Sequence, residues 1–138
     1  SHLFSVKNEN GSLKLTEQWS TKHQGYMSTP VVIDGVAYHH LKNQRLLALD
    51  LKTGKELWDK SNRFGKYWSM VTDGQKILAL DENGTLRLLN SNRTDFEELD
   101  NREVAEDSWA HVAVSNGQIF VRDLEKMTVY DWSTTGRP

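Results

Sequence analysis

The fold of this chain is indicated by one stretch, which reads Ala48-Leu49-Asp50-Leu51-Lys52-Thr53-Gly54-Lys55-Glu56-Leu57-Trp58. Its apolar beginning and its end around Trp58 each predict a short β-strand. Between them, the side-chain oxygens of Asp50 and Thr53 favour a tight turn, and Gly54 tolerates the positive φ that such a turn needs. The chain therefore reverses here. Trp58 is then placed on an outer strand, where its large flat ring packs against a neighbouring sheet.

A hairpin signal recurs before and after this stretch. Three β-rich segments each enclose a turn pair, at Asp34-Gly35, Asp73-Gly74 and Asn116-Gly117. The three glycines are 39 and then 43 residues apart. Asp-Gly and Asn-Gly pairs between strands favour type I′ turns, because both central residues of that turn have positive φ. The sequence therefore predicts three equivalent hairpins.

A further strand follows each hairpin, at Leu46–Asp50, Leu86–Asn90 and Met127–Asp131, and the strand ends are 40 and 41 residues apart. The first two units continue into a fourth strand, around Glu56–Trp58 and Phe96–Leu99. Four short strands in roughly 40 residues is the spacing of a propeller blade. The predicted fold class is all-β, a partial β-propeller of four-stranded antiparallel blades with about three and a half repeats.

The repeat divides the chain into blades. We expect 1–22 to be the end of a preceding blade, 23–61 and 62–102 to be complete blades, and 103–138 to be an incomplete blade. Within 1–22, Leu3–Val6 and Leu13–Trp19 are the predicted strands, joined across Asn10-Gly11. Because the chain enters and leaves in the middle of a blade and opens without a methionine, we expect a fragment of a longer protein.

The stretch at 48–58 resembles the tryptophan-docking motif of quinoprotein propellers, Ala-x-Asp-x-x-Thr-Gly-x-x-x-Trp. Its matching positions are Ala48, Asp50, Thr53, Gly54 and Trp58. In that family the motif is structural, and the resemblance implies that Trp58 belongs to a girdle between blades. The copy in the following blade keeps Asn90 and Thr94 but has no Gly or Trp at the matching places. The segment 1–22 keeps Trp19.

The resemblance extends from about Leu13 to Trp132, and the chain is similar to exported bacterial PQQ-like repeat proteins of the BamB-like type. It implies a periplasmic or extracellular location. A WD40 propeller is the nearest alternative, since Trp58-Asp59 supplies that family's dipeptide, but no Gly-His pair opens the blade.

Composition limits the partners. The formal net charge is −2, which gives no general attraction to nucleic acid. No run approaches 18 apolar residues, so membrane insertion through a helix is not predicted. The chain has no cysteine, which excludes disulfides and thiolate metal sites.

Enzymes of the resembled family hold PQQ, usually over calcium, with acidic and amide ligands. Asp34, Asp73 and Asn116 are already accounted for as turn residues, so we expect no catalytic, cofactor-binding or metal-binding residue here. Asp81-Glu82-Asn83-Gly84 is interpreted as a hairpin turn rather than a calcium loop. The adjacent His39 and His40 point to opposite faces of a strand, and so do not form one metal site by themselves.

Aromatic residues lie at the beginning of successive blades. We consider Tyr26, Tyr67, Trp68 and Trp109, with Arg122 nearby, a candidate binding rim at one end of the propeller channel. The alternative is ordinary packing between blades. His23 and His111 are expected near the same channel as ordinary polar positions.

The sequence leaves three functions open. The first is a non-catalytic scaffold that binds a protein or a small ligand. The second is part of a PQQ-dependent alcohol or sugar dehydrogenase whose cofactor site lies outside this fragment, and an ectodomain of a sensor is a third option. Open blade edges also predict self-association, because unpaired strand edges bind other strands.

Overall fold

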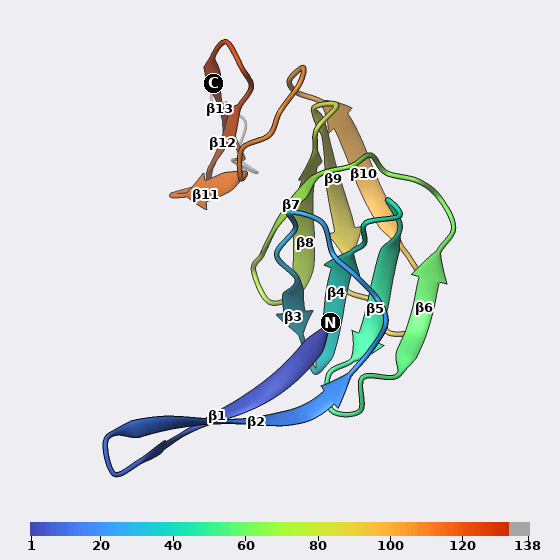
Figure 1. Ribbon diagram of the computed structural model, residues 1–138. Coiled ribbons are helices and arrows are strands. Elements are labelled where there is room, and N and C mark those ends of the chain that lie inside the picture. The colour runs from blue at the N-terminus through green and yellow to red at the C-terminus, as the bar shows by residue number, and fades with distance from the viewer. Residues whose placement is uncertain (133–138) are drawn as a thin grey trace.

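The computed structural model describes residues 1–132, and every helix or strand element in that range is a β-strand (Figure 1). A two-stranded hairpin, here called the N-terminal hairpin, is followed by sheets that we call the first, second and third blades. The hairpin consists of β1 (His2–Glu9) and β2 (Ser12–Ser20). The first blade consists of β3 (Val31–Ile33), β4 (Val36–His40), β5 (Leu46–Asp50) and β6 (Glu56–Lys60). The second consists of β7 (Trp68–Thr72), β8 (Lys76–Asp81), β9 (Thr85–Asn90) and β10 (Glu98–Glu103), and the third of β11 (Ala113–Ser115), β12 (Gln118–Arg122) and β13 (Met127–Asp131).

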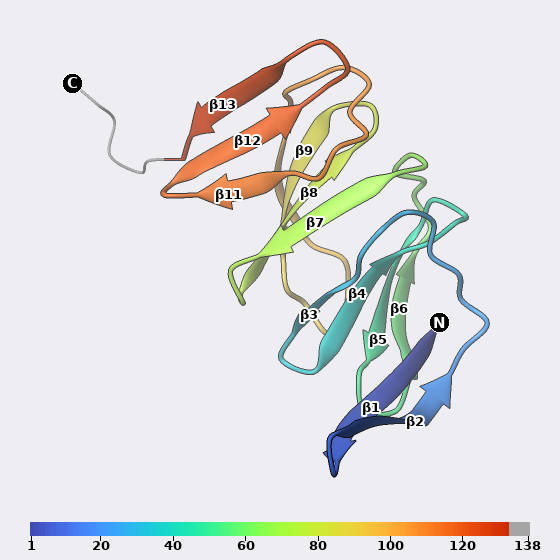
Figure 2. The same ribbon diagram turned by 60° about the vertical axis from the view of Figure 1, so that its left-hand side comes forward.

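Each sheet is antiparallel, and its strands follow one another in chain order. Figures 1 and 2 show the blades succeeding one another, with the N-terminal hairpin beside the first blade and the third blade beyond the second. This arrangement confirms the predicted fold class of four-stranded antiparallel blades. No helix in the described part of the chain is long and apolar enough to cross a membrane.

Two of the three predicted turns have the expected geometry. Asp34 and Gly35 have φ of 46° and 73°, and Asn116 and Gly117 have φ of 51° and 73°. In both hairpins two residues join the strands, since Ile33 pairs with Val36 in the first blade and the third blade repeats that register. These are the positive φ values that a type I′ turn requires.

The second turn differs from the other two. Thr72 pairs with Ile77, so the loop is longer, and of the Asp73-Gly74 pair only Gly74 has positive φ, at 93°. The Asp73 carboxylate accepts hydrogen bonds from the backbone N–H groups of Gln75 and Lys76, at 2.8 and 2.7 Å. These bonds stabilise a wider turn that a type I′ assignment does not describe.

One backbone hydrogen bond marks the equivalent point in all three blades, where the third strand ends beside the hairpin turn. The donor and acceptor pairs are Leu51 N–H to Gly35, Ser91 N–H to Gln75, and Trp132 N–H to Gly117. Gln75 therefore occupies the place that a glycine occupies in the other blades. The blades are equivalent, but the residue equivalent to Gly35 and Gly117 is Gln75. Gly74, which the sequence alignment matched to those glycines, lies one residue earlier.

The fourth strand of the second blade also begins later than predicted. It starts at Glu98 rather than Phe96, because the Asn90 N–H donates to the Glu97 carbonyl and closes a turn before the ladder resumes. Phe96 instead packs with the core cluster between the first two blades.

The core lies between neighbouring sheets rather than within one. The largest cluster joins the first and second blades through side chains such as Tyr38, Leu46, Trp68 and Ile77. A second cluster joins the second and third blades, and a smaller one joins Trp19 of the hairpin to the first blade. Burial between successive sheets is the source of stability expected for repeated blades.

Candidate functional site

The docking motif forms the turn that its residue types favour. The Asp50 carboxylate accepts hydrogen bonds from the backbone N–H of Thr53 at 3.0 Å and from its hydroxyl at 2.8 Å. The hydroxyl of Thr53 is the largest cause that lowers the pKa of Asp50, followed by the Arg93 guanidinium, which pairs with this carboxylate from the second blade. Gly54 has φ of 70°. The motif therefore contacts the following blade as well as closing its own turn.

Trp58 connects the first blade to the second. Its indole N–H donates to the Asn92 carbonyl at 2.9 Å, across the boundary between the two sheets. The ring lies 6.0 Å from the ring of Tyr38 and 6.2 Å from that of Phe96, measured between centroids. Trp58 is therefore a joint between blades, partly buried and satisfied in its single polar group.

Trp19 makes the same type of joint from the N-terminal hairpin to the first blade. Its indole N–H donates to the Leu51 carbonyl at 2.8 Å. The ring lies so close to Gly54 that a Cβ there would be 2.6 Å from a ring carbon. Gly54 is thus required for its positive φ and for the close approach of this tryptophan.

The residues of the candidate binding rim divide into two groups. Tyr67, only 3% exposed, stacks on Trp109 with ring centroids 5.9 Å apart, and His111 meets Tyr67 edge-on at 6.2 Å. Trp109 itself is 41% exposed, and its indole N–H donates to the Asp107 carboxylate at 2.6 Å. The structure therefore brings Tyr67 and Trp109 together at the boundary of the second and third blades.

Trp68 lies elsewhere, with none of its surface exposed. It stacks on His40 at 5.2 Å and packs against Phe64 at 5.0 Å, inside the core between the first and second blades. In this position Trp68 packs between blades and does not line a surface. Tyr26 is exposed, but no ring contact among residues 1–132 joins it to the other aromatic residues of the rim.

Arg122 contacts the segment before Trp109 through its backbone, since its carbonyl accepts a hydrogen bond from the Ser108 hydroxyl at 2.7 Å. The Ser108 backbone N–H in turn donates to the Glu82 carbonyl at 2.8 Å. Ser108 thereby fixes the start of the segment that carries Trp109. A binding role for the rim stays a prediction.

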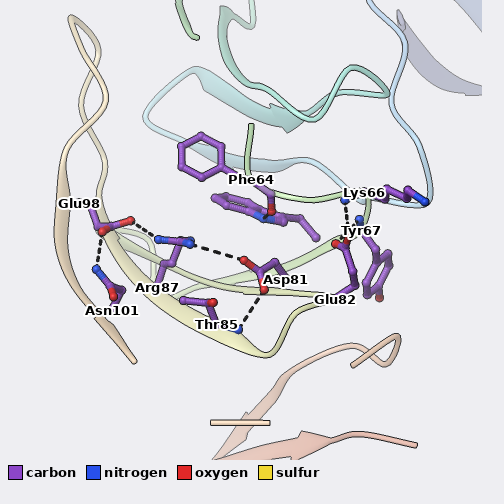
Figure 3. A network of polar contacts seen from close by, with 10 residues as sticks. Phe64, Lys66, Tyr67, Asp81, Glu82, Thr85, Arg87, Glu98 and Asn101 are labelled. Carbon is purple, nitrogen blue, oxygen red and sulfur yellow. Dashed lines mark hydrogen bonds and ion pairs between the residues drawn. The ribbon is translucent and has the colours of Figure 1, made fainter. Parts of the chain in front are cut away.

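Glu82 holds the backbone at Tyr67, the buried partner of the aromatic pair, as Figure 3 shows. Its carboxylate accepts hydrogen bonds from the backbone N–H groups of Lys66 at 2.6 Å and Tyr67 at 2.9 Å, at the beginning of β7. One residue thus holds Tyr67 through its side chain and the Trp109 segment through its backbone. From the sequence Glu82 was predicted only as a turn residue, because Tyr67 and Ser108 are distant from it in the sequence and leave no local signal.

The neighbouring Asp81 belongs to a second polar network in Figure 3. Its carboxylate accepts the Thr85 N–H at 2.9 Å and lies 3.6 Å from the Arg87 guanidinium, which also pairs with Glu98 at 2.9 Å. Burial is the largest influence on Asp81 and raises its pKa, although Arg87 opposes that effect. The network ties β8, β9 and β10 together within one blade.

Among residues 1–132, no three Asp, Glu or His side chains gather closely enough to hold a metal ion. His40 faces the core beside Trp68, whereas His39 lies against Gly25 on the other side of β4. His23 is 3.4 Å from Glu56, in a separate place.

The N-terminal hairpin and the first blade match the profile of a known protein family. Residues 2–60 match the sequence profile of the family described as outer membrane protein assembly factor BamB. The BamB protein of Yersinia pestis is 38% identical over 63 residues, which span 46% of this chain and 16% of that protein. The quinoprotein ethanol dehydrogenase of Pseudomonas aeruginosa is 43% identical over 61 residues, which span 41% of this chain and 10% of that enzyme. The chain therefore covers only a small part of the relatives that it matches.

Solved structures agree on the fold. BamB from Moraxella catarrhalis superimposes with a TM-score of 0.61 at 14% identity, over 97% of this chain and 45% of that protein. The β-propeller domain of Myceliophteria thermophila Cps50 (Swd1) gives 0.65 at 12% identity, over 95% of this chain and 49% of that domain. At these identities the likeness shows a β-propeller fold and nothing more specific. Together with the sequence matches, it confirms the predicted resemblance to PQQ-like repeat propellers.

Proposed function

We propose that this segment of a PQQ-like repeat β-propeller, similar to BamB, is a non-catalytic scaffold that binds a protein or a small ligand. The observation that carries the proposal is the Tyr67–Trp109 pair at the boundary of two blades, with Trp109 41% exposed. Trp and Tyr supply large, rigid contact area and dominate the energetics of protein interfaces. Because Glu82 and Ser108 fix both partners of the pair, little ordering entropy opposes binding there.

The relatives support the same proposal. Several matching proteins are named outer membrane protein assembly factor, a name that implies contact with other proteins. We propose by analogy that the whole protein is exported from a bacterium and acts in the periplasm or outside the cell.

A second function is favoured by a specific observation. The 43% identity to a quinoprotein ethanol dehydrogenase is higher than the 38% identity to Yersinia pestis BamB over a similar length. Under this alternative, the segment is part of a PQQ-dependent alcohol or sugar dehydrogenase, and residues outside this chain hold the quinone. The blades described here would then support that site.

Two measurements distinguish the functions. The full-length protein is titrated with PQQ and calcium while quinone absorbance and dye-linked alcohol oxidation are followed. The scaffold proposal predicts no turnover, and tight binding with turnover would establish the dehydrogenase instead.

The second measurement tests the aromatic pair directly. A photo-crosslinking phenylalanine analogue replaces Trp109 in cells, and the control carries it at Leu13 of the N-terminal hairpin, which is 70% exposed. We expect a crosslinked protein from position 109 and none from position 13. Equal products from both positions, or none from either, would contradict a protein-binding role for the pair.

We also propose that the edge of β13 pairs with a further strand. Within residues 1–132, β13 pairs with β12 on one side only. Either a strand from another part of a longer protein or a strand from a second copy would extend the sheet beyond β13. Light scattering over a concentration series tests the second source, which predicts a rise in mass with concentration.

A further inference from the structure

The joint between the second and third blades has no tryptophan at the position that holds one in the two preceding joints. In each of these sheets the pairing of the last two strands is interrupted by a β-bulge at the same point. The docking position is the residue of the last strand that follows the bulge and pairs with the strand before it. The three pairs are Trp19 with Leu3, Trp58 with Ala48, and Asp100 with Leu88. An aspartate therefore occupies the docking position of the second blade.

The surroundings of Asp100 are equivalent in the same way. In the first blade Val36 pairs with Asp50, and in the second Lys76 pairs with Asn90, so Leu78 stands where Tyr38 stands in the first blade. Tyr38 packs against the Trp58 ring. The fourth strand of the second blade offers Leu78 no such ring, because Asp100 occupies the position that Trp58 has in the first blade.

A groove occupies this place. It has a volume of about 470 Å³, with a floor that includes Leu78, Leu88, Ile119 and Tyr130 and a rim that includes Asp100. A second groove of about 700 Å³ shares Leu78 and Leu88 with it. Both are of the size that proteins use for small ligands.

Trp132 lines both grooves from the side of the third blade, but it does not close them. It remains 42% exposed, and its described contact at this turn is its backbone bond to Gly117. The grooves therefore form one apolar joint, open to solvent, where the earlier joints are filled by an indole ring.

The rim of the smaller groove is acidic. Asp100 and Glu103 line it together with Arg102, which pairs with Asp100 at 3.3 Å. Glu103 also borders an adjoining pocket whose lining includes Glu106. A partner that brings positive charge is favoured at this rim.

We propose that the groove between the second and third blades binds a tryptophan side chain of another polypeptide, in a segment that carries basic residues beside the tryptophan. The chain's own joints show which ring fits between its blades, with the indole N–H directed at a backbone carbonyl of the following blade. The apolar floor takes the ring, and the acidic rim takes the neighbouring charges. The inference concerns one joint, goes beyond the proposed function, and holds whether or not the whole protein turns over a quinone.

Two peptides and one filled variant test the proposal. The probes are acetyl-Lys-Trp-Lys-amide and acetyl-Lys-Ala-Lys-amide, added to the protein with its leucine methyl groups labelled for NMR. We expect saturable shifts of the Leu78 and Leu88 methyl signals with the tryptophan peptide and none with the alanine peptide. Asp100→Trp places the chain's own indole in the groove, and we expect the affinity for the tryptophan peptide to fall at least tenfold.

Two controls keep the outcome decisive. Asp100→Asn leaves the groove open, so the tryptophan peptide should still bind, with a weaker dependence on salt. If Asp100→Trp unfolds at a lower temperature than the wild type, Leu88→Phe serves as a second variant that narrows the groove. Equal shifts with both peptides, no shift with either, or unchanged binding by both filled variants would overturn the proposal.

Discussion

Lowering the pH should loosen the boundary between the first and second blades through His40. This side chain is fully buried, and its ring stacks on Trp68 at 5.2 Å with an interplanar angle of 10°. Burial is the largest influence and lowers the pKa of His40 from 6.5 to about 4. The charge of Glu82 opposes the shift, and that of His39 adds to it.

The sign and the size follow from the two pKa values. Between pH 6.5 and 4 the unfolded chain binds a proton at this histidine and the folded chain does not. The contribution to folding stability is therefore complete above pH 6.5, and it is lost as the pH falls toward 4. A difference of this size corresponds to about 3 kcal/mol in total, of which about 2 kcal/mol is lost between pH 7 and 4.5.

Urea unfolding at pH 7 and pH 4.5 measures this loss. His40→Phe keeps an aromatic ring on Trp68 but removes the titrating group. The free energy of unfolding that the variant loses between pH 7 and pH 4.5 should therefore be smaller than the wild type's loss by about 2 kcal/mol. His39 also has a lowered pKa and Asp81 a raised one, but both remain in the variant, and the difference isolates His40. Identical pH dependence in the wild type and His40→Phe would refute the reasoning, and His2→Phe at an exposed position is the control.

Further predictions concern the joints and the polar network. Gly54→Ala should lower the free energy of unfolding by at least 2 kcal/mol in thermal unfolding, because the alanine would have φ of 70° and its Cβ would clash with the Trp19 ring. Gly35→Ala is the control, because open space surrounds that position, and it should cost about 1 kcal/mol. Trp58→Phe should cost about 1 kcal/mol, since it leaves the ring packing but removes one hydrogen bond to the second blade; an unchanged unfolding midpoint would contradict this. Arg87→Met should lower the free energy of unfolding by about 3 kcal/mol at pH 7, because it leaves the buried Asp81 carboxylate without its cation. The cost should be smaller in acid, where that carboxylate is protonated, and a cost that does not change with pH would count against the network.

Local chemistry made the repeat predictable from the sequence. The turn at Gly35 needs positive φ at two adjacent residues, and Asp-Gly is one of the few pairs that supply it, so the hairpin is visible without any tertiary information. The same holds for the turn that Asp50 and Thr53 close. Strand ends at these turns consequently agree with the sequence prediction.

Contacts between blades were harder to predict, because they join residues that are distant in the sequence. Tyr67 and Trp68 are adjacent, yet one faces Trp109 and the other lies in the core with His40. Strand alternation separates them, but only the packing of the blades decides which of the two is buried among its neighbours. The contact of Glu82 with Ser108, in the segment that leads to the third blade, was missed for the same reason.

Register explains the remaining misses. The glycine alignment placed Gly74 with Gly35, whereas the hydrogen bond to Ser91 shows that Gln75 is the equivalent residue. The docking position at Asp100 was likewise hidden, since a bulge of one residue in the strand pair changes which side chain faces the next blade.

The aspartate at the last joint has a consequence for how the molecule opens. In a linear series of units, each unit is held by its own interior and by its two neighbours, so cooperative unfolding separates at the weakest boundary. Within residues 1–132, the boundary at Asp100 lacks the docking indole of the two earlier joints, and we expect it to open before the boundary between the first and second blades. Amide protons of β12 should therefore exchange with deuterated water earlier than those of β4 and β8, through openings that leave the rest of the molecule closed.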